Sequence, residues 1–174
     1  MNFEIKKLSA QDIDDFSDLI RIFELVFEID HFKMPDEKHL LGLLSKPDFF
    51  ALVARHDNKV LGGLTVYILH GYYSTKPTAY IYDVGVLGDY QRKGIGKKLM
   101  TYLTNYCKEN GFEEAFVEAE TGDTQAVNFY KTTAFSNQLQ ATHFTYSFDE
   151  TNTGNETNAE RSETHEHFDA ENHR

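Results

Sequence analysis

The chain has 174 residues, of which 28 are acidic and 17 basic, so its formal net charge is -11. This balance argues against a nucleic-acid-binding protein, which usually carries a basic surface, and against docking on an anionic membrane. It is compatible with a cationic partner, because acidic clefts concentrate cations. Hydrophobic residues make up 40% of the chain and aromatic residues 14%, which predicts a folded domain with a sizeable core.

The sequence lacks the signatures of disulfides, metal sites, secretion and membrane insertion. The single cysteine, Cys107, excludes an internal disulfide, and no set of Cys and His has the spacing of metal ligands, so we expect no bound metal. The first residues lack the basic and apolar regions of a secretion signal. The longest apolar stretch, residues 60–69, is far short of the ~20 residues that a membrane helix needs. We therefore expect a cytoplasmic protein with no membrane or nucleic-acid partner.

The composition changes after Phe148. Residues 149–174 contain eight acidic and two basic residues and no Leu, Ile, Val or Met. A segment of this composition cannot bury enough apolar surface to fold by itself. We therefore divide the chain into a folded domain, residues 1–148, and an acidic polar C-terminal tail, residues 149–174.

Hydrophobic periodicity predicts both strands and helices in the folded domain. We expect Ser9 to be the N-cap of the first helix and Gly111 to end the long helix. The order of elements predicts a mixed α/β fold, in which helices cover the faces of a mixed sheet. The predicted elements are a strand at 2–8, a helix up to residue 27, a short helix between residues 35 and 46, strands at 49–55, 60–70 and 79–87, a helix at 94–110, a strand at 113–120, a helix from 123 to about 133, and a last strand at 142–148.

A glycine-containing loop, residues 86–96, joins a predicted strand to the long helix. The first N–H groups of a helix have no acceptor within the helix and can bind an anion. Gly94 and Gly96 would let a diphosphate approach the main chain closely, and Arg92 and Lys93 add positive charge. From these residues alone, a turn whose glycines serve only the backbone geometry is equally consistent.

Two common phosphate-binding motifs are excluded for this loop. Gln91 stands where a Walker A loop has its first Gly, and Lys98 replaces the Ser or Thr of that motif. Leu99 stands where a dinucleotide-binding fingerprint has its third Gly. Residues 86–96 therefore belong to neither of these two motifs.

A second motif follows at residues 123–135, with Asn128 and Tyr130 in a predicted helix and Ala134-Phe135 after it. Together with the loop, this motif resembles the GNAT superfamily of acetyl-CoA-dependent N-acetyltransferases. The pyrophosphate loop of that family reads Gln/Arg-x-x-Gly-x-Gly/Ala, which the glycine loop matches. Ala134 departs from the usual Gly of the second motif.

The resemblance is closer to one subfamily, the type I aminoglycoside 3-N-acetyltransferases. Residues 80–86, 122–130 and 61–64 look like the corresponding segments of those enzymes. The resemblance implies a GNAT-like fold, whose central sheet is mostly antiparallel and whose two parallel strands splay apart, with flanking helices. It also implies that acetyl-CoA is the co-substrate and lies where the strands splay, and it is compatible with a homodimer.

The resemblance assigns the coenzyme to the splayed strand, the glycine loop and the second motif. Main-chain groups near Val84 and Val86 would bind the acetyl end, amides of the loop would bind the diphosphate, and Asn128 would bind the arm between them. The residues so assigned are Val84, Val86, Gln91, Arg92, Lys93, Gly94, Ile95, Gly96, Lys97 and Asn128.

The resemblance also indicates direct attack by an amine, without an acyl-enzyme. The amine must lose a proton, and Asp83 is our first choice for the general base. Tyr130 would act as proton donor to the departing thiolate, although a tyrosine on an amphipathic helix is more often part of the core. Cys107 lies in the middle of the long helix, so we interpret it as a packed side chain rather than a nucleophile.

Three carboxylates, Glu118, Glu120 and Asp123, are candidates for binding the cationic substrate. Alternation along a strand would put Glu118 and Glu120 on one face. Each has another interpretation: Asp123 is a good helix N-cap, and the two glutamates also suit a solvated strand edge.

These features predict an enzyme that transfers acetyl from acetyl-CoA to an amino group of an aminoglycoside, most specifically the 3-amino group of deoxystreptamine, and thereby confers resistance. The alternatives are acetylation of another amine, such as a polyamine or a peptide amine, and a binding module for CoA or a drug without turnover.

Overall fold

The computed structural model describes residues 2–148, and the helices and strands of these residues all lie within a compact unit that ends at residue 136. The elements, in chain order, are β1 (Glu4–Lys7), α1 (Ile13–Val26), α2 (Glu37–Leu44), β2 (Phe49–His56), β3 (Lys59–Leu69), β4 (Thr78–Val86), the 3-10 turn η1 (Gly88–Tyr90), α3 (Ile95–Glu109), β5 (Glu114–Val117) and α4 (Thr124–Lys131).

The five strands form one sheet in the order β1-β2-β3-β4-β5. Neighbouring strands pair antiparallel except β4 and β5, which pair parallel and are connected through α3. A parallel pair requires such a crossover connection. The predicted mixed α/β fold, mostly antiparallel with one parallel pair, is therefore confirmed.

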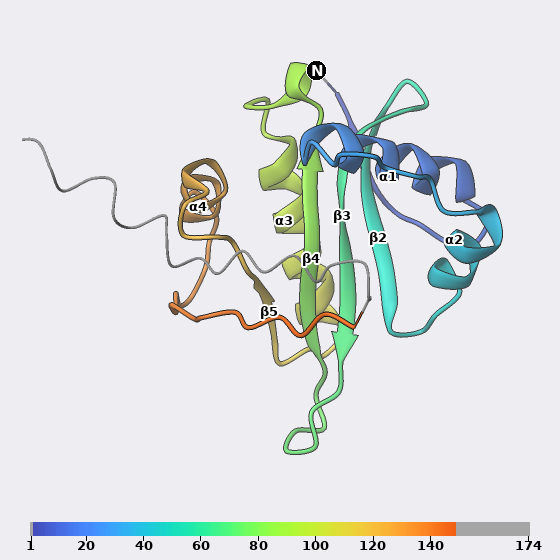
Figure 1. The fold of residues 1–174 in the computed structure, drawn as a ribbon. Coiled ribbons are helices and arrows are strands. Elements are labelled where there is room, and N and C mark those ends of the chain that lie inside the picture. The colour runs from blue at the N-terminus through green and yellow to red at the C-terminus, as the bar shows by residue number, and fades with distance from the viewer. Residues whose placement is uncertain (1, 149–174) are drawn as a thin grey trace, which may run out of the picture. The chain divides into compact units, whose positions relative to one another are not determined.

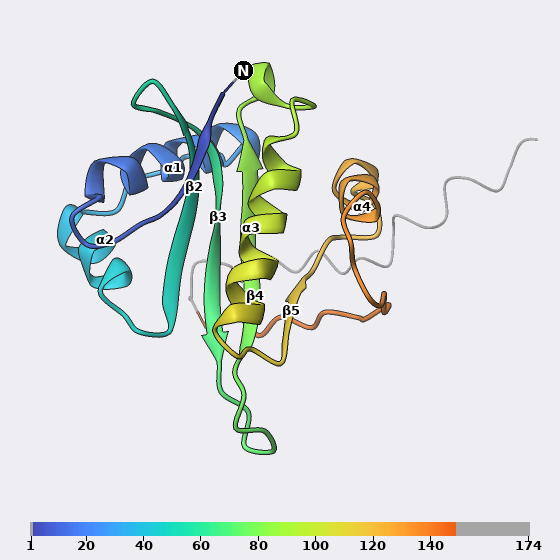
Figure 2. The ribbon, with the colours of Figure 1, turned by 180° about the vertical axis from the view of Figure 1, so that it is seen from behind.

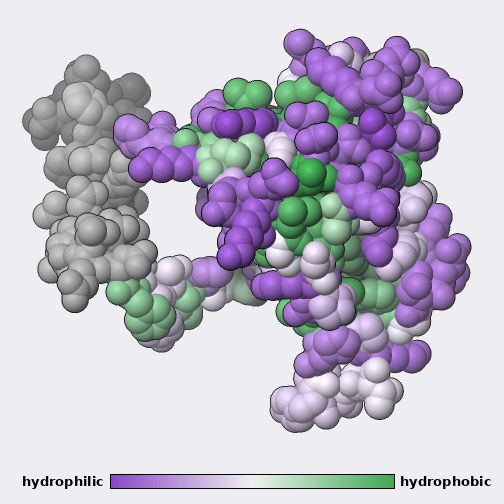
Figure 3. All heavy atoms as spheres, turned by 90° about the vertical axis from the view of Figure 1, so that its right-hand side faces the viewer, coloured by the Kyte–Doolittle hydropathy of each residue, from purple (hydrophilic) through white to green (hydrophobic). Residues whose placement is uncertain are grey.

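Helices cover both faces of the sheet: α1 and α2 lie on one face and α3 on the other (Figures 1 and 2). The central strands read as nearly continuous apolar runs because they are buried on both faces, β2 over residues 49–54 and β3 over residues 60–66. Phe16 and Leu19 of α1 anchor one core cluster, and Leu99 and Leu103 of α3 anchor the other. Burying each such side chain contributes about 1.5–3 kcal/mol. From the side of α2, hydrophilic side chains dominate the surface around a small hydrophobic area (Figure 3).

Two helix ends follow local sequence rules. The Asp36 carboxylate accepts a hydrogen bond from the His39 main-chain N–H at 2.8 Å and caps α2. Gly111 follows α3 with a φ of +75°, a left-handed conformation that glycine adopts without strain. The Phe112 N–H then donates to the Cys107 carbonyl at 3.0 Å, which closes the helix end.

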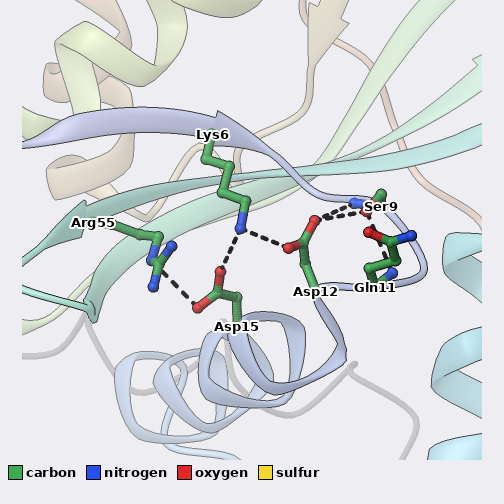
Figure 4. Close-up of polar contacts among 6 residues, drawn as sticks. All are labelled: Lys6, Ser9, Gln11, Asp12, Asp15 and Arg55. Atoms are coloured by element: carbon green, nitrogen blue, oxygen red, sulfur yellow. Dashed lines mark hydrogen bonds and ion pairs between the residues drawn. The ribbon is translucent and has the colours of Figure 1, made fainter.

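The expectation for the start of α1 was wrong. Ser9 is not the N-cap, because the helix begins at Ile13 and Asp12 occupies the cap position without a side-chain capping bond. Instead, the Asp12 carboxylate accepts hydrogen bonds from the Ser9 N–H at 2.9 Å and the Ser9 hydroxyl at 2.8 Å (Figure 4). The side chain turns back because it also pairs with Lys6 of β1, whose Nζ lies 2.6 Å from Asp12 Oδ1.

Lys6 and Asp12 belong to a small ion network that ties α1 to the sheet (Figure 4). Lys6 Nζ also lies 3.2 Å from Asp15 Oδ2, and Arg55 Nε of β2 lies 3.4 Å from Asp15 Oδ1. The Lys6 ammonium, through its hydrogen bond, lowers the pKa of Asp12 to about 2. The network therefore connects β1, β2 and α1 through side chains that are mostly shielded from solvent.

Two predicted strands differ from the structure. β5 ends at Val117 rather than residue 120, and residues 142–148 form no strand. A strand exists only through pairing with a neighbour, and every pairing in the described residues lies within the five strands above. The predicted tail, residues 149–174, lies outside the described residues, so the division at residue 148 stays a prediction.

Candidate active site

The site begins where β4 and β5 part. Their parallel pairing runs from Thr78 opposite Glu114 to Ile81 opposite Val117, where β5 ends. β4 continues to Val86, so its edge toward β5 is unpaired over residues 82–86. The predicted splayed pair of parallel strands is present at this point.

A β-bulge in β4 lies at the same level. Asp83 pairs with Thr65 of β3, but the next pair is Ile81 with Val66, so Tyr82 is an extra residue. A bulge of this kind interrupts the alternation of side chains. Val84, like Ile81, packs against the core on the α3 side, whereas the Tyr82 ring contacts Tyr67 on the α1 side.

The bulge brings Asp83 beside Thr65 on the α1 side of the sheet. The buried Thr65 hydroxyl donates a hydrogen bond to Asp83 Oδ2 at 3.2 Å. Burial raises the pKa of Asp83, and the hydrogen bond from Thr65 partly opposes this rise. The carboxyl group is therefore a stronger base than an exposed aspartate, and it lies next to the strand opening.

Main-chain groups of β4 face this opening. The Leu87 N–H donates to the Leu61 carbonyl of β3 at 3.0 Å, so alternation directs the N–H and C=O of Val86 and Val84 away from β3. The Gln91 side chain donates to the Val86 carbonyl at 3.1 Å, in agreement with this direction. Val84 and Val86 therefore present main-chain groups where the resemblance places the acetyl end of the coenzyme.

The tip of α3 is open at its N-terminal end. Gly94 is the N-cap with a φ of +83° and no side-chain capping bond, and the Lys98 N–H makes the first helical bond to the Gly94 carbonyl. Arg92 also has a positive φ, of 58°. Alternating left- and right-handed residues before a helix turn successive N–H groups toward a common point, which suits an anion.

The two loop glycines have different tasks. A Cβ at Gly94 would meet open space, so this glycine serves the left-handed backbone. A Cβ at Gly96 would lie 2.9 Å from Cε2 of Phe129, so the absence of a side chain lets α4 approach α3 closely. From the sequence, both glycines either admit a diphosphate or serve the backbone geometry, and neither alternative includes the contact of Gly96 with α4.

α4 contributes the polar groups on the other side of the opening. Asp123 Oδ1 accepts a hydrogen bond from the Ala126 N–H at 2.9 Å, so Asp123 is the N-cap of α4, one of its two interpretations. Asn128 is exposed. Burial raises the pKa of Tyr130 to about 12, and the carboxylates of Asp123 and Asp83 add to this rise. Tyr130 therefore keeps its proton at neutral pH and lies within electrostatic reach of Asp83.

A cavity of about 610 Å³ lies beside the loop and the end of α1. Val26, Leu87, Tyr90 and Gln91 contribute to its walls, and Gln125 of α4 borders it from the opposite side. Gln125 Nε2 donates to Gln91 Oε1 at 3.4 Å and thereby connects α4 to the loop. This volume falls within the range of small-molecule sites.

The sequence predicted that Glu118 and Glu120 share one face of a strand. This prediction is wrong, because β5 ends at Val117 and neither residue lies in a strand. Glu118 Oε2 accepts a hydrogen bond from the Tyr80 hydroxyl at 3.2 Å. Glu120 is exposed after the strand end.

The sequence assigned no role to three residues, Thr65, Tyr80 and Gln125, although Tyr80 and Gln125 lie in segments that carry the resemblance. Their contacts join segments 18, 38 and 34 residues apart, so local spacing does not reveal these contacts. Cys107 is buried and burial raises its pKa to about 11, in agreement with the interpretation as a packed side chain.

Two further observations concern only the described residues 2–148. They hold no group of three or more Cys, His, Asp and Glu side chains arranged as for a metal ion. None of their helices has both the length and the apolar character of a membrane span.

Comparison with known proteins agrees with this geometry. An aminoglycoside acetyltransferase, meta-AAC0020 from an uncultured soil metagenomic sample, in complex with sisomicin, is 45% identical with a TM-score of 0.83, over 84% of this chain and 97% of that one. The fold is shared at 16% identity by AAC(6')-Iy bound to a bisubstrate analogue, CoA-S-monomethyl-acetylneamine, with a TM-score of 0.69 over 85% of this chain and 100% of that one.

N-alpha-acetyltransferase 50 of Danio rerio is 32% identical over 57 residues, which are 32% of this chain and 34% of that protein. The aligned stretch thus spans about a third of that curated relative. The family model described as acetyltransferase (GNAT) family matches residues 16–135, which include the splayed strands, the open helix tip and Tyr130. The chain belongs to the GNAT family of acetyltransferases.

Proposed function

We propose that the chain is an acetyl-CoA-dependent N-acetyltransferase that acts on an aminoglycoside, with the 3-amino group of the deoxystreptamine ring as its target. The observation that carries this proposal is Asp83, a half-buried carboxylate beside an unpaired strand edge. The 45% identity with an aminoglycoside acetyltransferase supports the choice of substrate.

The residues of the opening suit acetyl-CoA. The uncapped N–H groups of Ile95, Gly96 and Lys97, with the charges of Arg92 and Lys93, would hold the diphosphate. The outward N–H and C=O groups of Val84 and Val86 would hold the pantetheine arm in the manner of an added strand, once Gln91 releases the Val86 carbonyl. Asn128 would contact the same arm from α4.

Asp83 would act as the general base. An amine attacks only as the neutral species, and most substrate amines are protonated at pH 7, so a proton acceptor speeds the reaction. The raised pKa of Asp83 makes its carboxylate a stronger proton acceptor, and the hydrogen bond from Thr65 fixes the orientation of this carboxylate. The new N–C bond forms as the C–S bond breaks, and the amine proton goes to Asp83.

Tyr130 would stabilise the departing sulfur. Its pKa of about 12 lies above that of an ordinary thiol, near 8.5, so full proton transfer to the thiolate is unfavourable. A hydrogen bond from the phenol to the developing negative charge is the role that this pKa supports.

Acetylation would remove one positive charge from the drug. Aminoglycoside ammonium groups bind RNA phosphates by charge, so each lost charge weakens binding, and we propose that the activity confers resistance in this way. A peptide amine is the second candidate acceptor, because of the local match with an N-alpha-acetyltransferase.

A thiol-release assay tests the proposal. Acetyl-CoA is mixed with the protein and, in turn, a deoxystreptamine aminoglycoside, spermidine, and a peptide with a free N-terminus. We expect CoA release with the aminoglycoside and an acetyl group on its 3-nitrogen by NMR. Release only with spermidine or the peptide would refute the choice of acceptor, and no release with any amine would refute the enzyme.

Asp83→Asn tests the base in the same assay. General-base catalysis is typically worth 10²–10⁴-fold, so we expect kcat/KM to fall about 100-fold or more. The folded pKa of Asp83 is raised above 3.8, so wild-type activity should fall as the pH drops through that raised pKa. The pH–activity profile of the variant should not show this fall. Asp18→Asn, an exposed position on α1, is the matched control.

A further inference from the structure

Four aromatic rings form a continuous row on the α1 side of the sheet, across β3, β4 and β5. This aromatic row consists of Tyr67, Tyr82, Tyr80 and Phe116. Tyr67 pairs with Tyr80, and Tyr80 with Phe116, in the strand register, so these three side chains share a face. Tyr80 and Phe116 stack with centroids 4.8 Å apart, and Tyr82 stands edge-on to Tyr67 at 5.4 Å and to Tyr80 at 5.8 Å.

The aromatic row is accessible. Tyr82 is 58% exposed, although the adjacent Ile81 on β4 is buried, and Phe116 of β5 is 36% exposed. α1 covers the other end of this face, where Phe23 approaches Gly85 (Figure 1). Large exposed aromatic surface next to a catalytic opening indicates a ligand site.

Carboxylates surround the aromatic row. Tyr80 holds Glu118 by its hydroxyl at 3.2 Å, and Asp83 lies beside Tyr82 in the chain on the same face. Burial raises the pKa of Tyr67, and the charges of Tyr82, Asp83 and Asp48 add to the rise. The row therefore combines flat apolar surface with negative charge along its length.

Among the described residues, no lysine or arginine lies over a ring of the aromatic row, although Tyr80 and Phe116 cover one face of each other. Within residues 2–148, the cation–π contacts of lysine and arginine involve other rings, Phe3, Phe32, Phe50, Tyr90 and Tyr106. Tyrosine faces flanked by carboxylates attract ammonium groups. A cationic ligand fits this surface by charge.

Beyond Phe116, the aromatic row opens into a cavity of about 300 Å³. Phe116, Glu114 and Tyr73 contribute to its walls, with Leu69 from the end of β3. Lys76 also borders it, so this positive charge lies at the far end of the row from Asp83. The surface thus extends from Asp83 past Glu118 and is longer than a single amine requires.

We propose that the aromatic row binds the second and further rings of an oligocationic amino sugar, while Asp83 receives the reacting amine at one end of the row. This inference rests on the proposed function and specifies how the acceptor is selected. The apolar faces of the sugar rings lie on the exposed rings of Tyr82 and Phe116, between which Tyr80 packs. Glu118, positioned by the Tyr80 hydroxyl, pairs with an ammonium group of a ring that does not react. A flexible polyamine can use the carboxylates but gains little from the flat aromatic surface.

The test compares a three-ring aminoglycoside with 2-deoxystreptamine, which has one ring. Dissociation constants are measured by titration calorimetry without acetyl-CoA, and CoA release is measured in parallel. We expect Tyr82→Ala and Phe116→Ala each to weaken binding of the three-ring ligand about 10-fold and to change binding of deoxystreptamine less than 2-fold. Tyr102→Ala, a tyrosine of similar exposure on α3, is the control and should change neither.

Two further variants test the role of the Glu118 carboxylate and leave every aromatic ring in place. Glu118→Gln should weaken binding of the three-ring ligand and reduce its salt dependence, because an ion pair is lost. Tyr80→Phe should have a smaller effect in the same direction, since the ring remains and only the hydrogen bond to Glu118 is removed. Wild-type melting temperatures in both variants would confirm intact folding.

The outcomes separate this inference from the proposed function. Unchanged affinity for the three-ring ligand in Tyr82→Ala and Phe116→Ala, or an equal loss for deoxystreptamine, overturns the aromatic row as a binding surface even if CoA release is normal. Selective loss of three-ring binding supports the row even if the wild type releases no CoA, which would refute only the enzymatic proposal.

Discussion

Tyr130 shows how its surroundings determine what a side chain can do. Burial and two nearby carboxylates raise its pKa to about 12, so the phenol holds its proton throughout the neutral range. The same burial prevents it from acting as a strong acid. Its contribution should therefore appear only when negative charge builds up on the leaving sulfur.

We expect Tyr130→Phe to lower kcat about 10- to 100-fold and to leave the KM for acetyl-CoA within 2-fold. An interaction made only in the transition state lowers kcat and kcat/KM equally. Steady-state kinetics at saturating aminoglycoside provide the measurement, with Tyr102→Phe on α3 as the control. An unchanged kcat would show that Tyr130 is only a packed core residue.

At the scale of the elements, the glycine loop holds α3 and α4 together as well as presenting its amides. Gly96 allows Phe129 of α4 to lie against the first turn of α3, because a Cβ there would be 2.9 Å from the ring. A Cβ at Gly94 would have no such neighbour, and glycine is needed there because the backbone is left-handed, with a φ of +83°. The two glycines should therefore fail for different reasons when they are replaced.

Gly96→Ala should destabilise the protein by about 1–3 kcal/mol through overpacking. Gly94→Ala should cost about 1–2 kcal/mol through backbone strain. A double-mutant cycle with Phe129→Leu, measured by urea unfolding, separates the two effects. The smaller side chain should reduce the loss of stability caused by Gly96→Ala and should not change the loss caused by Gly94→Ala. Equal coupling of both glycines to Phe129 would contradict the assignment.

At the scale of the whole folded unit, the ion network of Lys6, Asp12, Asp15 and Arg55 links β1, α1 and β2. The folded pKa of Asp12 is about 2, below the ordinary 3.8. A lowered carboxyl pKa stabilises the fold above the unfolded pKa, and this stabilisation is lost as the pH falls through the folded pKa.

We expect Asp12→Asn to lower the free energy of unfolding by about 1–2 kcal/mol at pH 7, after allowance for partial solvent screening. The difference between variant and wild type should shrink as the pH falls from about 4 to about 2, because the wild-type carboxylate then becomes protonated. Urea unfolding at several pH values measures it, with Asp14→Asn as an exposed control. A difference that is independent of pH would contradict the ion-pair account.

Much of the fold and part of the candidate site could be predicted from local patterns. The apolar runs of the central strands, the Asp36 and Asp123 caps and the Gly111 stop depend on residues within one turn or strand of each other. The loop indicated the open tip of α3 for the same reason, since a helix start is recognisable from adjacent residues. The loop and the motif at residues 123–135 together indicated the family.

Only the tertiary structure decided which distant groups meet. The bulge at Tyr82 depends on the register between β3 and β4, and it alone brings Asp83 beside Thr65. Ser9 failed as a cap because Lys6, on another element, draws the Asp12 side chain toward the sheet. The residues at 142–148 alternate like a strand but have no partner among the paired strands. A sequence determines local conformation through interactions between near neighbours, whereas register, pairing and burial depend on segments that meet only after folding.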